Sequence, residues 1–148
     1  ERFAVREISK RTGIPKSSIQ RYIGKLRKQG IISNDNMPII TPYFKFVKSF
    51  FIIDRLFKTG LVDYLEKELN ASAIIVFGGS RKGEYDKDSD IDLFVASTGK
   101  KEVNLAAFEK KLGHRIHLFI KKDINELPPR LLNNVVNGIK LRGYFKVR

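Results

Sequence analysis

The sequence has no cysteine among its 148 residues. Disulfide bonds are therefore excluded, and their absence is typical of a protein that folds in a reducing compartment. The chain also starts with charged residues rather than an apolar leader, so we expect a cytoplasmic protein. Because the first residue is Glu1 and not Met, we expect that an amino-terminal segment precedes it.

Long uninterrupted apolar runs are missing as well. The richest apolar stretch, 43–57, contains Lys45, Lys48, Asp54 and Arg55, so it cannot span a bilayer, and we expect no membrane partner. Hydrophobic residues nevertheless make up 42% of the chain, which is enough for a packed core. The length allows one ordinary domain or two very small ones.

Acidic residues are scarce. The 29 Lys and Arg residues outnumber 16 Asp and Glu residues, and the formal net charge is +13. An excess of this size predicts polyanionic partners, of which nucleic acid is the commonest and a membrane surface the main competitor.

A short apolar run, 73–77, ends at two glycines and predicts a buried strand followed by a turn. Gly78 and Gly79 have no Cβ, so phosphate groups can approach their backbone N–H groups directly. The three residues that follow add a hydroxyl group and positive charge. The predicted nucleotide-binding residues are Gly78, Gly79, Ser80, Arg81 and Lys82.

Two aspartates begin the next alternating segment. Alternation from Asp90 places Asp90, Asp92 and Phe94 on one side of a strand, so two carboxylates lie side by side. A cation relieves their repulsion, and oxygen ligands favour Mg²⁺ or Mn²⁺ bridging to substrate phosphates. An acidic loop that runs into an ordinary strand is the alternative, although two aspartates on one face of an apolar strand are costly without a partner.

This segment resembles the signature of the DNA polymerase beta nucleotidyltransferase superfamily, in its minimal-domain branch. Gly78, Gly79, Asp90 and Asp92 match the signature, whereas Ser80 stands one place later than the serine that is common there. The resemblance covers roughly 43–144. It implies transfer of a nucleoside monophosphate from a metal-bound nucleoside triphosphate, with Asp90 and Asp92 as catalytic metal ligands. It also implies that some relatives adenylylate a small helical toxin, so a protein tyrosine is one candidate acceptor.

The third strand predicted from the alternation, 115–120, carries His117 where the resembled family usually has a third carboxylate. Three interpretations stay open: a working base or metal ligand, a site that binds nucleotide without transferring it, and an ordinary half-exposed strand histidine. Asp86, Asp88 and Asp123 replace the missing carboxylate only if the fold brings them close.

The first segment predicts two short helices joined by a glycine turn. Helical character over 5–12 is interrupted at Gly13, and a second helix, capped by Ser17 or Ser18, continues to Gln29. A small hairpin over 31–40 follows. The segment resembles the winged helix-turn-helix domains of small transcription regulators, over about 2–41. The predicted contacts to double-stranded DNA are Lys16, Ser17, Ser18, Gln20, Arg21, Lys25 and Lys28.

A packing module with a merely solvated basic face is the alternative for this segment. We predict an α+β protein with a winged helix domain at 1–42 and a nucleotidyltransferase-like domain at 43–148, whose short mixed sheet is flanked by helices. The linker helix at 43–58 is apolar nearly all round. It therefore predicts burial on two sides, against the catalytic domain and against either the winged helix or a second copy of the chain in a homodimer. An intramolecular core helix is the alternative.

Further helices are expected at 61–69, at 101–112 and from Leu131 to near Gly138, with a solvated basic tail after them. Two functions remain. The first is a DNA-tethered nucleotidyltransferase that uses Asp90, Asp92 and His117. The second is a DNA-binding regulator whose nucleotidyltransferase-like domain senses nucleotide or mediates assembly.

Overall fold

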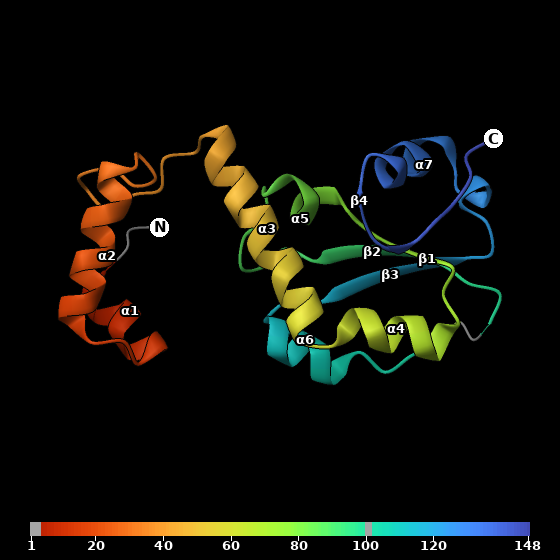
Figure 1. Cartoon of the computed structure of the whole chain (residues 1–148), viewed down its shortest axis with the longest axis horizontal. Coiled ribbons are helices and arrows are strands. Elements are labelled where there is room, and N and C mark those ends of the chain that lie inside the picture. The colour runs from red at the N-terminus through yellow and green to blue at the C-terminus, as the bar shows by residue number, and fades with distance from the viewer. Residues whose placement is uncertain (1–3, 100–101) are drawn as a thin grey trace. The chain divides into compact units, whose positions relative to one another are not determined.

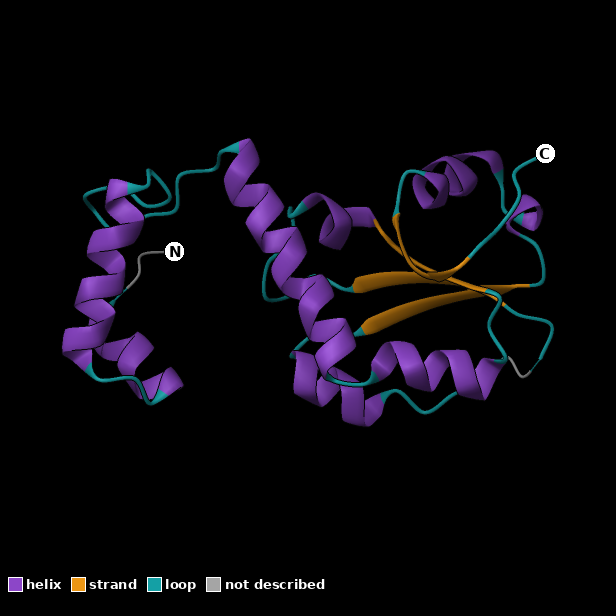
Figure 2. Cartoon of the chain, in the orientation of Figure 1, coloured by secondary structure: helices purple, strands orange, loops and turns teal. Residues whose placement is uncertain are grey.

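A computed structural model describes residues 4–99 and 102–148. The chain divides into two compact units, Glu1–Lys45 and Phe46–Arg148. The first unit is helical, and the second contains a β-sheet between helices (Figures 1 and 2). The predicted domain boundary after residue 42 falls at the start of helix α3 (Pro42–Lys58), which continues from the first unit into the second.

The first unit is built on α1 (Val5–Thr12) and α2 (Lys16–Lys28). Gly13 takes a φ of 71° between them, a left-handed conformation that suits glycine and turns the chain. Ile19 and Ile23 of α2 are buried together with Ile32, and this small core holds the helices and the following loop together.

Two details of the first unit differ from the expectation. Pro15 occupies the N-cap of α2 and no side chain caps the helix, so neither Ser17 nor Ser18 has the predicted capping role. The predicted hairpin is reduced to a single bridge between Ile32 and Pro38. Two backbone hydrogen bonds flank this bridge, from the Ser33 N–H to the Met37 carbonyl at 2.8 Å and from the Ile39 N–H to the Ile31 carbonyl at 2.9 Å.

The second unit contains a four-stranded sheet in the order β3-β2-β1-β4. Its strands are β1 (Ala73–Phe77), β2 (Ile91–Ala96), β3 (Ile116–Lys121) and β4 (Ile139–Gly143). β1 is antiparallel to β2 and β4, whereas β2 and β3 are parallel. The mixed sheet flanked by helices confirms the predicted α+β fold.

The basic tail after α7 was predicted to be solvated. Its basic side chains are exposed, but residues 139–143 form strand β4 of the sheet, which the sequence did not predict. The segment pairs with β1, from Val76 opposite Ile139 to Ala73 opposite Gly143. Arg142 also lies 2.6 Å from Asp63 and 3.1 Å from Glu66 of the helix α4 (Leu61–Leu69). The carboxyl-terminal part of the chain is therefore an edge strand of the sheet.

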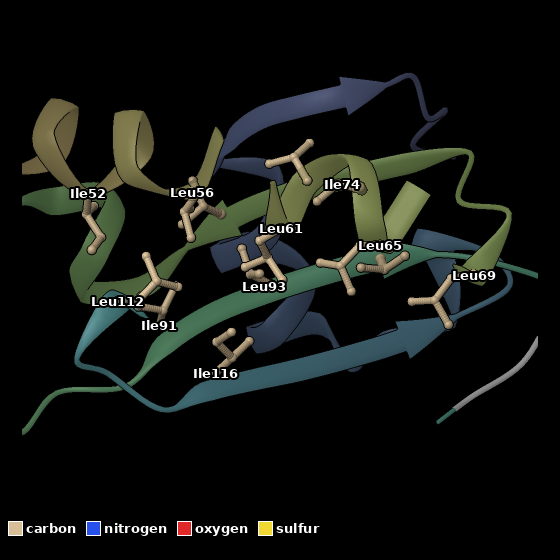
Figure 3. Close-up of a cluster of buried hydrophobic side chains, with 13 residues drawn as sticks. Ile52, Leu56, Leu61, Leu65, Leu69, Ile74, Ile91, Leu93, Leu112 and Ile116 are labelled. Carbon is tan, nitrogen blue, oxygen red and sulfur yellow. The ribbon is translucent and has the colours of Figure 1, made fainter. Parts of the chain in front are cut away.

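Two cores cover the two faces of this sheet. Alternation along β2 sends Ile91 and Leu93 into one core and Phe94 into the other. The first core lies against α3, α4 and α6 (Ala106–Leu112), as Figure 3 shows for side chains of these helices and the strands. The second lies against η1 (Ile124–Glu126) and α7 (Pro129–Val136), on the opposite face of the sheet from α4 (Figure 1).

The predicted helix at 101–112 begins later, at Ala106, and residue 101 lies outside the described residues. Helix α7 begins at Pro129, two residues before the predicted start, and ends at Val136. No described helix meets the length and hydropathy that a membrane span requires.

Helix α3 is buried on one side only within the described chain. Ser49, Ile52 and Leu56 are buried against the sheet unit. Four phenylalanines on its other faces, Phe46, Phe50, Phe51 and Phe57, are between 44% and 64% exposed. Burial of α3 on a second side, by the winged helix or by a second copy of the chain, therefore stays a prediction.

Candidate functional site

Three neighbouring strands bring three residues to one level at an end of the sheet. Phe77, the last residue of β1, is the register partner of Asp92 in β2, and Asp92 is the partner of His117 in β3. Alternation along the strands puts Asp92 and His117 on the face that carries Phe94 and Phe119. This is the face covered by α7.

Gly78 follows β1 directly and lies against Asp92. Its φ is 67°, and a Cβ built on it would lie 2.2 Å from the Oδ2 atom of Asp92. Only glycine fits here, because a side chain would displace the carboxylate and strain the backbone. Residues 78–82 form the short helix α5 (Gly78–Lys82) rather than the predicted simple turn.

The other oxygen of Asp92 faces His117. The Nδ1 atom of His117 lies 3.3 Å from Oδ1 of Asp92, and the two side chains are 58% and 27% exposed. An ionised carboxylate can only accept a hydrogen bond, so Nδ1 of His117 donates to Asp92, and Nε2 is the ring nitrogen left to exchange a proton with a ligand. The Asp92 carboxylate thus stands between Gly78 and an imidazole.

Burial is the main cause that raises the pKa of Asp92 above its ordinary value. The charge of His117 and its hydrogen bond lower this pKa, and the negative charge of Asp90 raises it. Asp90 is exposed immediately before β2 and is therefore close enough to Asp92 for their charges to interact. That both aspartates share one face of the strand stays a prediction, because β2 begins at Ile91 and Asp90 precedes it.

The three other aspartates considered for the third position have local roles. Asp86 accepts hydrogen bonds from Ser89 Oγ at 2.9 Å and from the Asp88 N–H at 3.0 Å, which hold the loop before β2. Asp88 is exposed on that loop. Asp123 caps η1 beyond the carboxyl end of β3, whereas His117 is near the amino end of that strand. Asp123 therefore lies at the wrong end of the strand.

Ser80 does not suit the predicted contact with a phosphate. Its side chain is fully buried, and among the described residues its hydroxyl oxygen has no hydrogen-bond partner. A ligand in contact with solvent cannot reach this hydroxyl without a rearrangement of α5. Its two neighbours in sequence, Arg81 and Lys82, are exposed.

Helix α3 fixes the position of α5 and of the loop that follows it. The Ser49 hydroxyl donates a hydrogen bond to the Arg81 carbonyl at 2.8 Å, and the Tyr85 hydroxyl donates one to the Lys48 carbonyl at 2.9 Å. The ammonium group of Lys48 lies 4.4 Å from the centre of the Tyr85 ring and donates to the Tyr85 carbonyl. These contacts support the residues beside Gly78.

A cavity of about 510 Å³ opens beside the glycines. Four of the predicted nucleotide-binding residues line it from α5, and three asparagines from the end of α7 line it as well. The sequence signature did not identify these asparagines, because isolated amides form no recognisable motif; only the spacing of Asn133, Asn134 and Asn137 on one helix indicated a shared face. The lining residues are Gly78, Gly79, Arg81, Lys82, Glu84, Asn133, Asn134 and Asn137.

A second cavity, of about 600 Å³, lies on the other side of Asp90. It is formed by the loop before β2 and by the connection from α6 to β3. His114 there contacts the Ser89 carbonyl through Nδ1 at 2.8 Å and lies edge-on to Tyr85. The lining residues are Lys87, Asp88, Ser89, Asp90, Glu109, Gly113, His114 and Arg115.

The donors at the sheet end suit a magnesium or manganese ion that is completed by a substrate. In the described part of the chain no group of three His, Cys, Asp or Glu side chains has the arrangement of a metal site. Mg²⁺ commonly needs only one or two protein carboxylates, with substrate phosphates and water as its other ligands. Asp90 and Asp92 provide two carboxylates of the type that this coordination needs.

The predicted DNA contacts lie on α2 of the first unit. Lys16, Ser17, Gln20, Arg21, Lys25 and Lys28 are exposed, and Ser18 is half-buried. They lie on the sides of α2 that are not buried with Ile19 and Ile23. Arg27 donates a hydrogen bond to Asn36 Oδ1 at 2.6 Å, so the second helix is joined to the loop that follows it.

Two protein families match the chain. Residues 58–142, more than half of it, match the family described as nucleotidyltransferase domain. Residues 4–33 match the family described as winged helix-turn-helix DNA-binding. No curated protein matches the chain as a relative. The two matches confirm the fusion of domains that the motifs predicted.

Proposed function

Because the chain belongs to the nucleotidyltransferase domain family, we propose that it transfers a nucleoside monophosphate from a nucleoside triphosphate to an acceptor hydroxyl. One observation carries the proposal: the Asp92 carboxylate presents one oxygen to Gly78 and the other to His117. Asp92, the proposed metal ligand, thus contacts both the proposed phosphate-binding segment and the candidate base.

The cavity beside α5 takes the nucleotide. Arg81 and Lys82 are exposed cations at its edge, and they attract the phosphates. Gly78 and Gly79 let the phosphates approach the backbone, because no Cβ blocks the space. Gly78 also lies against Asp92, so phosphates bound along α5 are next to the end of the sheet that carries Asp92 and His117.

Asp90 and Asp92 are the residues that would hold Mg²⁺ or Mn²⁺. When bound, the metal supplies charge stabilisation for the phosphates during phosphoryl transfer. The raised pKa of Asp92 agrees with a carboxylate that lacks a strong cationic partner in the protein itself.

His117 takes the proton. The acceptor oxygen forms a bond to the α-phosphorus, the bond from phosphorus to the pyrophosphate oxygen breaks, and pyrophosphate leaves. The acceptor's proton goes to Nε2 of His117, since Nδ1–H is held toward Asp92. A base in this position contributes about 10²–10⁴-fold to the rate.

The winged helix-turn-helix domain attaches the enzyme to DNA. Its exposed contacts on α2 include Lys16, Gln20 and Arg21, and the net charge of +13 adds sequence-independent attraction to phosphates. The acceptor is a hydroxyl near that DNA or a protein tyrosine. A small helical toxin-like partner is the protein acceptor that the family resemblance suggests.

A second function is favoured by His117 itself. The position that usually carries a third carboxylate holds an imidazole in this chain. A site that lacks the third carboxylate binds the nucleotide but transfers its nucleoside monophosphate slowly. The protein then acts as a DNA-binding regulator whose nucleotidyltransferase-like domain senses nucleotide or mediates assembly.

A transfer assay separates the two functions. The wild type, Asp90→Asn and Asp92→Asn are incubated with α-labelled nucleoside triphosphates, Mg²⁺ or Mn²⁺, and a cell extract as the source of acceptors. Metal-dependent labelling of a macromolecule that both variants lose supports the enzyme. Equal background in all three proteins contradicts it, and nucleotide binding without transfer supports the regulator.

The exposed face of α3 binds a second copy of the chain. Tyr43, Phe46, Phe50, Phe51 and Phe57 are each 44–64% exposed on this helix. They present about 500 Å² of aromatic surface per copy, so two copies bury about 1,000 Å², the lower limit for a specific interface. Light scattering should give a dimer for the wild type and a monomer for Phe50→Glu. A wild-type monomer at all concentrations would exclude the homodimer.

A further inference from the structure

We propose that the three asparagines at the end of α7 bind the base and ribose of the nucleotide, while α5 binds its phosphates. This inference rests on the proposed function, because it concerns the same cavity. Asn133, Asn134 and Asn137 form one wall of that cavity, and α5 forms the other. The short motif that carries the family resemblance, Gly78, Gly79, Asp90 and Asp92, includes no residue of α7.

Close packing fixes this wall beside the glycines. Gly138, directly after Asn137, lies against β1: a Cβ on it would approach Ile75 Cγ2 to 2.5 Å and the Val76 carbonyl oxygen to 2.7 Å. The next residue, Ile139, pairs with Val76 in the sheet. The end of α7 is therefore held beside Val76, which precedes Gly78 by two residues in the chain.

One wall of the cavity is basic and the other is neutral, which matches the charged phosphates and the uncharged base and ribose of a nucleotide. Arg81 and Lys82 place positive charge on the α5 side. The α7 side offers only neutral amides, which have no preference for a polyanion but form hydrogen bonds with polar edges. Glu84 also lines the cavity, and its carboxylate repels phosphate and accepts hydrogen bonds from hydroxyl or amino groups. A volume of about 510 Å³ is within the range of small-molecule sites.

The orientation of one amide is fixed by the helix. The Nδ2 group of Asn137 donates a hydrogen bond to the Asn133 carbonyl at 2.8 Å. Only the amide nitrogen can donate to a carbonyl, so Oδ1 of Asn137 is presented as an acceptor. Asn133 and Asn134 are exposed, and each offers a donor beside an acceptor, the pattern that pairs with the edge of a base.

Comparing a nucleotide with a bare phosphate chain tests the assignment. Calorimetric titrations with Mg²⁺ measure the affinity of the full chain for nucleoside triphosphates and for inorganic tripolyphosphate. The variants are Asn133→Ala with Asn134→Ala, and Arg81→Ala. Asn34→Ala, an exposed asparagine of the first unit, is the matched control.

The double asparagine variant should bind the preferred nucleoside triphosphate about tenfold more weakly, as expected for two lost hydrogen bonds, and tripolyphosphate within twofold of wild type. Arg81→Ala should weaken both ligands. Unchanged nucleotide affinity in the double variant, or an equal loss for both ligands, would overturn the inference and leave the proposed function standing. A wild type that binds neither ligand would overturn both.

Discussion

The imidazole of His117 and the carboxylate of Asp92 face each other across parallel strands, with Nδ1 of the histidine 3.3 Å from Oδ1 of the aspartate. The strand register makes them direct partners, so their proximity follows from the sheet rather than from a flexible loop. The remaining oxygen of Asp92 lies on the Gly78 side.

Removing the imidazole should slow transfer. We expect His117→Ala to reduce the rate by about 10²–10⁴-fold with little change in nucleotide affinity, because the ring acts on the proton of the acceptor. The measurement is the single-turnover rate of labelled-nucleotide transfer. His114→Ala is the control, since this ring contacts the Ser89 carbonyl instead of Asp92. Similar rates for His117→Ala and wild type would show that the histidine is not the base.

Neutralising Asp92 should stabilise the metal-free protein. Burial raises the pKa of Asp92 in the folded state, so the folded protein holds this proton more tightly than the unfolded chain. Stability is therefore lost as the pH rises through this pKa, and the penalty is fully present at neutral pH. Asp92→Asn should raise the Tm by roughly 1–4 °C at pH 7, which corresponds to about 1 kcal/mol or less of unfolding free energy in a domain of this size.

Thermal unfolding in EDTA measures this effect. The gain should shrink as the pH falls through the raised pKa of Asp92 and vanish below the ordinary aspartate pKa of about 3.9. Asp88→Asn, at an exposed position of the preceding loop, should change the Tm little. A lower Tm for Asp92→Asn at pH 7 would mean that its interaction with His117 outweighs the cost of burial.

Gly78→Ala should destabilise the protein and disturb Asp92. The added methyl would overlap Oδ2 of Asp92, and the φ of 67° disfavours alanine, so we expect a loss of about 1 kcal/mol or more and weaker nucleotide binding. Gly79→Ala is the matched control for stability, because its Cβ would meet no atom closer than 3.7 Å. Denaturant titration measures both variants. Equal stability of the two would contradict the close approach of Gly78 and Asp92.

Arg21→Ala should weaken DNA binding. Arg21 is exposed on α2 opposite the buried Ile19 and Ile23, and loss of one arginine contact costs about 1–3 kcal/mol. Gel-shift titration at fixed salt concentration measures the affinity. Lys67→Ala removes the same charge from an exposed position of α4 and should have a smaller effect. If both substitutions reduce the affinity equally, only net charge is involved.

The sequence predicted the parts of the site that lie next to strong local signals. The apolar run before Gly78 and the alternation after Asp90 indicated β1 and β2, and a third alternating segment indicated β3. The residues that match the family motif lie at the end of β1 and the start of β2. Local patterns therefore identified the sheet end that carries Asp92 and His117.

Other parts depend on tertiary packing that local patterns do not encode. Strand β4 carries Lys140 and Arg142 at the edge of the sheet, and such charged edge strands resemble solvated tails in sequence. Ser80 matched a phosphate-binding serine by type, yet the short helix α5 turns its side chain into the interior. The asparagine wall depends on the approach of Gly138 to β1.

The most direct test of the central claim is the affinity for a nucleoside triphosphate measured by calorimetry, with Mg²⁺ and with EDTA, for the wild type, Asp90→Asn and Asp92→Asn. We predict micromolar to millimolar binding for the wild type that EDTA weakens at least about tenfold, and comparable weakening in both variants with Mg²⁺ present. Binding of equal strength in all these conditions would contradict the claim that Asp90 and Asp92 hold a metal-bound nucleotide.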